Sequence, residues 1–152
     1  MDVVTRITKD HRELEEMIGK VTSGKGEDQR GAFERLCMTL LAHEHAEEQK
    51  VYPELSKVSE GQAKEKVHHA TEEQHQTELM VQQLREMGPE AKEFRAMFDK
   101  MAKAVQQHMT EEENELLPRL AEAVDAERLG ELGRSFADAR DTELARGAHA
   151  GS

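Results

Sequence analysis

The chain has 152 residues, a length typical of one domain, of which 36% are hydrophobic and 35% are charged. Its formal net charge of −11 argues against nucleic acid and anionic membranes as partners, because both are negatively charged themselves. No apolar run approaches the length of a membrane span, and the first residues do not resemble a signal peptide. Cys37 stands alone, so no internal disulfide is available, and we expect a cytoplasmic protein that buries this thiol.

The composition predicts an all-α fold. Helix-favouring Ala, Leu, Met, Glu, Lys and Gln are abundant, Val, Ile, Thr and aromatic residues are scarce, and no strand pattern occurs. We expect an up-down-up-down four-helix bundle (residues 1–124), an extra short C-terminal fifth helix of the same domain (125–146) and a disordered tail (147–152). Breaks at Gly and Pro place the helices at about 3–22, 28–58, 62–87, 89–123, with Pro89 first, and 126–145.

One motif occurs twice, in the second and the fourth expected helix. Each copy has a His, a Glu four residues later, another Glu directly after it and a Pro ten residues after the His. The copies begin at His43, with Glu47, and at His108, with Glu112. Residues four apart share a helix face, and at about 100° per residue both pairs fall on the apolar face. A carboxylate there is costly unless it is paired, which indicates that something binds to it.

The other two long helices each carry a histidine at a matching level. His11 lies on the apolar stripe of the first helix, and His75 lies beside Leu79 on the third. His11 precedes His43 by 32 residues, and His75 precedes His108 by 33. Residues equidistant from a short turn come level in an antiparallel pair of helices. We therefore expect six side chains near one level of the bundle: His11, His43, Glu47, His75, His108 and Glu112.

Imidazole and carboxylate groups without thiolate suit iron, manganese or zinc. Six ligands, including two carboxylates able to bridge, match two metal ions better than one structural zinc. The His-x-x-x-Glu spacing alone is weak evidence, because it recurs at His68 and at His69 without the Pro and the apolar flanks. The ferritin-like pattern needs two Glu-x-x-His motifs, and the chain has one match, ending at His75.

The order of the four histidines and two glutamates, with a Pro after each motif, resembles the hemerythrin-like (HHE cation-binding) family over residues 3–123. The resemblance implies a four-helix bundle that holds two non-haem iron ions with an oxo or hydroxo bridge. By matching position it implies that His11, His43, His75 and His108 are terminal ligands. It also implies that Glu47 and Glu112 are bridging carboxylates.

The sequence departs from the family's oxygen carriers, which use five histidines. The positions that would supply the fifth are Thr71 and Leu79, and Glu112 follows its His by four residues where the carriers have an Asp after five. One iron therefore lacks a nitrogen ligand, leaving a place for water, substrate or another side chain. Tyr52 is a candidate for that place if Pro53 re-aims it. Otherwise it is an aromatic residue at the bundle edge.

Two functions of different classes follow from the resemblance. An iron pair with a replaceable ligand favours an enzyme acting on a small oxidant, foremost a catalase-like decomposition of hydrogen peroxide, with nitric oxide next. The alternative is binding or sensing of nitric oxide or oxygen, or iron-dependent folding read by a partner, without turnover. The sequence leaves the choice of small molecule, any protein partner and the oligomeric state open.

Overall fold

The computed structural model describes residues 1–150, except the side chains of 148–150; the end of the expected disordered tail, 151–152, lies outside them. The described residues contain helices and no strand, which confirms the all-α class. None of these helices is long and apolar enough to cross a membrane. The elements are α1 (Val3–Ser23), α2 (Gly26–Lys50), α3 (Tyr52–Lys57), α4 (Gln62–Met87), α5 (Phe94–Glu111), the π-helical turn η1 (Glu112–Leu116), α6 (Leu117–Ala123) and α7 (Ala126–Ala150).

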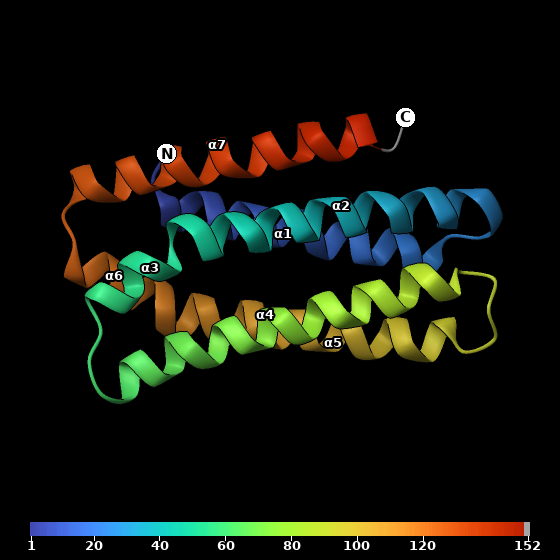
Figure 1. Cartoon of the computed structure of the whole chain (residues 1–152), viewed down its shortest axis with the longest axis horizontal. Coiled ribbons are helices and arrows are strands. Elements are labelled where there is room, and N and C mark those ends of the chain that lie inside the picture. The colour runs from blue at the N-terminus through green and yellow to red at the C-terminus, as the bar shows by residue number, and fades with distance from the viewer. Residues whose placement is uncertain (151–152) are drawn as a thin grey trace.

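The long helices lie side by side, and each runs opposite to the one before it (Figure 1). α1 pairs with α2 and α4 with α5, and α7 packs along α1 and α2 on the side away from the other pair. Gly133 permits this close approach, because a Cβ there would lie 2.9 Å from the backbone of Met1 to Val3. α7 also extends to Ala150, beyond residue 146 where we expected the helix to end.

Two of the expected helices are interrupted. α2 ends at Lys50, and α3 begins at Tyr52 with Pro53 in its first turn, where a missing N–H does least harm. The fourth expected helix contains the π-helical turn η1, which begins at Glu112 and ends at Leu116. α6 follows directly, with Pro118 in its first turn. A π-helical turn inserts extra backbone into a helix and occurs frequently at functional sites.

The expected start of the fourth helix at Pro89 was wrong. Gly88 takes a positive φ of 82° and ends α4. Two turns follow, closed by hydrogen bonds from Ala91 N to Gly88 O and from Phe94 N to Ala91 O. α5 therefore begins at Phe94, one short loop later than predicted.

Two apolar clusters form the core, with a polar layer between them. Along α1, Ile7 belongs to one cluster and Leu14 to the other, and His11 lies between them. Along α2, His43 lies in the same way between Leu40 and Ala46. α7 contributes to the core as well, since its Leu132 and Phe136 are buried in the cluster that contains Ile7. The polar layer is thus enclosed on both sides by packed apolar side chains.

Candidate metal centre

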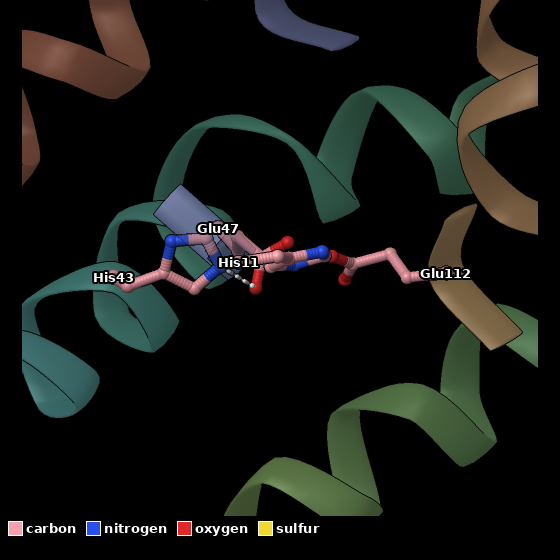
Figure 2. A group of neighbouring side chains, drawn as sticks. All are labelled: His11, His43, Glu47 and Glu112. Carbon is pink, nitrogen blue, oxygen red and sulfur yellow. Dashed lines mark ion pairs between the residues drawn. The ribbon is translucent and has the colours of Figure 1, made fainter. Parts of the chain in front are cut away.

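Four side chains from three helical elements meet in the polar layer. His11 comes from α1, His43 and Glu47 from α2 and Glu112 from η1, and one ligand atom of each lies within 4.8 Å of the others. All four are buried. Figure 2 shows them pointing toward one another. Nε2 of His11 lies 3.0 Å from Oε1 of Glu112, and Nε2 of His43 lies 3.1 Å from Oε1 of Glu47.

His108 and Tyr52 border this group from α5 and α3. Nε2 of His108 lies 3.6 Å from Oε2 of Glu112 and 3.1 Å from the Tyr52 hydroxyl. That hydroxyl donates to Oε2 of Glu112 at 2.5 Å and accepts a hydrogen bond from Gln74 Nε2 at 3.1 Å. The break before Pro53 therefore turns Tyr52 inward, so that its oxygen reaches the ligand groups.

His75 does not join the group, and its expected inward placement was wrong. Its side chain is 60% exposed, and its Nε2 lies 3.5 Å from Oε1 of Glu48. The preceding Gln74 occupies the interior and donates to Oε1 of Glu47 at 2.8 Å. Matched spacing predicted the level along the axis correctly, but one residue on an α-helix turns the side chain by about 100°. The inward face of α4 runs through Val67, Ala70, Gln74, Thr77, Val81 and Leu84.

Each of the three histidines that are buried among the described residues has a carboxylate behind it. In every case Nε2 faces the interior, while Nδ1 lies within hydrogen-bonding distance of an acidic side chain farther out. Metal-binding histidines show this pattern, because the outer carboxylate fixes the tautomer and the ring orientation. Sequence reasoning missed Asp10 and Glu73, although Asp10 directly precedes the buried His11 and Glu73 directly precedes the buried Gln74. The pairs are His11 with Glu113 at 2.8 Å, His43 with Asp10 at 2.9 Å, and His108 with Glu73 at 3.1 Å.

The pKa values show how the metal-free group balances its charge. Burial lowers the pKa of His43, but the charge of Glu47 and the hydrogen bond with Asp10 outweigh it and raise the pKa to about 10. Burial likewise lowers the pKa of His108, and the hydrogen bond with Glu112 helps to raise it to about 11. Burial and the charge of Glu112 raise the pKa of Glu47 to about 7. Protons on imidazoles thus neutralise carboxylates, a role that bound cations would take over.

Several buried polar atoms of this region make no well-aligned hydrogen bond, although Nε2 of His11 and of His43 lie within ion-pair distance of Glu112 and Glu47. Such atoms are costly, and a cation would give each of them a partner. They include an oxygen of Glu44, which is buried one residue after His43 and whose pKa is raised well above its ordinary value by burial. Sequence reasoning missed Glu44, because the second copy has Met109 at that position and the repeat gave no signal. The atoms are Nε2 of His11 and His43, Oε1 of Glu44, Glu112 and Gln74, and Oε2 of Glu47, with Oε1 of Glu48 nearby.

An all-α chain that buries imidazoles and carboxylates with atoms that make no well-aligned hydrogen bond has the features of a metal-binding protein. The family model of the hemerythrin HHE cation-binding domain matches residues 2–120. The chain therefore belongs to this family, as the sequence motifs predicted. The match ends before α7 begins at Ala126. The comparisons found no matching curated protein and no matching solved structure.

Proposed function

We propose that the group around Glu47 and Glu112 binds two iron ions, and that both carboxylates bridge them. The observation that carries this proposal is a set of buried side-chain nitrogen and oxygen atoms that make no well-aligned hydrogen bond and that converge on one place. Imidazole and carboxylate donors without thiolate suit iron. Nε2 of His11 and Nε2 of His43 each lie beside one of the two carboxylates, which would supply a nitrogen ligand to each ion.

The remaining ligand positions have candidates among the bordering residues. His108 offers its Nε2, while Glu44 and Tyr52 offer buried oxygen atoms. We do not include the exposed His75. Gln74 holds Glu47 and Tyr52 in place through its amide nitrogen. The proposed ligand set has three histidines, fewer than the oxygen carriers use, which favours turnover over reversible oxygen carriage.

The proposed architecture is a four-helix bundle of alternating direction, formed by residues 1–124. In this arrangement α1, α2, α4 and α5 each contribute at least one side chain to the polar layer. Residues 125–146 belong to the same domain, because α7 buries Leu132 and Phe136 in the shared core.

We propose that the protein decomposes hydrogen peroxide into oxygen and water. Bound iron would supply a Lewis acid and two-electron redox chemistry. An open pocket of about 590 Å³ lies beside the centre, lined by α3 and α4 residues including Ser56 and Thr71. Tyr52 lines this pocket and also contacts Glu112, so it stands between the pocket and the ligand groups. The Tyr52 hydroxyl donates to Glu112, so the residue that lines the pocket also holds one of the proposed ligand carboxylates.

The test is oxygen evolution from peroxide by the iron-loaded protein, with an equal concentration of free iron as the reference. Wild type should exceed free iron, whereas His108→Ala at matched iron loading should not. His75→Ala is the control, because His75 is exposed on α4 and does not line the pocket. If wild type matches free iron and its reduced form binds oxygen or nitric oxide reversibly, binding or sensing without turnover replaces the enzymatic function.

A further inference from the structure

α7 reaches the metal centre although it lies outside the region that the family model matches. The ring of Phe136 packs edge-on against the ring of His43, with centroids 5.3 Å apart and planes at 81°. One turn later, the guanidinium of Arg140 lies 5.7 Å from the centroid of Phe136. Arg140 also donates through Nη1 to Oδ1 of Asp10 at 2.5 Å. Two neighbouring turns of α7 thus touch His43 and the carboxylate behind it.

Asp10 joins α7 to the centre because its two oxygens bond in different directions. Oδ1 accepts from Arg140, and Oδ2 lies 2.9 Å from Nδ1 of His43. Since a carboxylate can only accept, Nδ1 of His43 is the donor and carries the proton. In the neutral imidazole Nε2 then holds the lone pair, and it faces Glu47 at 3.1 Å. Arg140, Asp10 and His43 form one line of contacts from α7 to the ligand group.

The carboxylates behind the other two histidines are more exposed, and Arg12, the arginine that contacts Glu113, has a side chain that is 53% exposed. Glu113 behind His11 has a side chain that is 25% exposed, and Glu73 behind His108 has one that is 26% exposed. The side chain of Asp10 is only 8% exposed. A carboxylate this deeply buried is costly without a cationic partner, and Arg140 supplies one whose position is fixed by the packing of α7.

We propose that α7 controls metal binding at His43, with Arg140 as a positioning residue that acts through Asp10. Arg140 holds the Asp10 carboxylate directed at Nδ1, and Asp10 keeps Nε2 of His43 directed at the metal. Phe136 excludes water from the same imidazole. Partners of this kind behind a metal-binding histidine change metal affinity by about 10- to 100-fold. This inference rests on the proposed binding of metal by the group around Glu47 and Glu112.

The experiment compares Co²⁺ binding by full-length wild type, Arg140→Gln and Arg128→Gln, followed by visible absorption. Arg128 is the matched control: it also ties α7 to another helix, through hydrogen bonds of 2.9 and 3.1 Å to Glu54 on α3, but does not contact the metal centre. Arg140→Gln should weaken Co²⁺ binding by about 10- to 100-fold and change the absorption bands. Arg128→Gln should keep the affinity and the spectrum of wild type.

A conservative variant separates positioning from general destabilisation. Arg140→Lys keeps a cation beside Asp10 and should recover part of the lost affinity, whereas a purely structural role of α7 would lower the melting temperature and leave the affinity and spectrum unchanged. If Arg140→Gln does not fold, Asp10→Asn decides, because it alters the contact with His43 and leaves the α7 side chains Phe136 and Arg140 themselves unchanged. Unchanged affinity and spectrum in the folded variants would overturn the role of α7 alone. Wild type that binds no metal would overturn the proposed function as well.

Discussion

Replacing Phe136 by Ala tests whether α7 belongs to the core of the domain. Phe136 is fully buried, packs in the cluster that contains Ile7 and Leu120, and covers the ring of His43. Truncating a buried Phe to Ala costs about 3–5 kcal/mol, through lost burial and the cavity left behind. Domains are stable by only about 5–15 kcal/mol, so this is a large share of the total. For a chain of this length the loss corresponds to a melting temperature lower by about 6–20 °C.

The assay is equilibrium unfolding in urea of the metal-free protein, followed by circular dichroism, with the free energy of unfolding extrapolated to water. Leu79→Ala is the control, because the side chain of Leu79 is 55% exposed on α4 and its loss should change the free energy by less than about 0.5 kcal/mol. A loss below about 1 kcal/mol for Phe136→Ala would refute the conclusion that α7 completes the core.

Three further predictions concern the proposed metal centre. Because the pKa values of His43 and His108 are raised to about 10 and about 11, metal binding at neutral pH should release protons and tighten as pH rises; calorimetric heats that do not depend on the buffer would contradict this. His75→Ala should retain the iron content of wild type, because His75 is exposed; lost iron would contradict its placement. If Tyr52 binds ferric iron through its phenolate oxygen, the protein should show a broad visible charge-transfer band that Tyr52→Phe removes while iron is retained. An unchanged spectrum would limit Tyr52 to hydrogen bonding with Glu112.

The duplicated motif was the feature of the sequence that predicted most of the candidate site. Its period placed His43 with Glu47, and His108 with Glu112, on apolar faces, and both pairs are buried in the structure. His11 was found because it interrupts an apolar stripe, and it lies between the two core clusters. Helical periodicity predicts which face a residue occupies wherever apolar neighbours define that face on both sides.

The remaining features depend on packing that a periodic pattern does not carry. The third helix has few apolar residues, so its inward face was poorly defined, and His75 was chosen where Gln74 lies inside. The contacts of Asp10 with Arg140 join residues 130 positions apart on different helices. Sequence spacing holds no information about such a pair. The π-helical turn at Glu112 likewise follows from local backbone geometry that Pro118 alone did not indicate.

Iron content per chain tests the central claim most directly. Wild type loaded anaerobically with Fe²⁺ and freed of excess metal should retain about two irons per chain, because two buried carboxylates with imidazoles beside them match the proposed iron pair. Glu112→Gln should lose most of this iron, since its side chain lies at 3.0 Å from His11 and within 3.6 Å of His108. One zinc and no iron in wild type, or full iron retention in Glu112→Gln, would contradict the proposed centre.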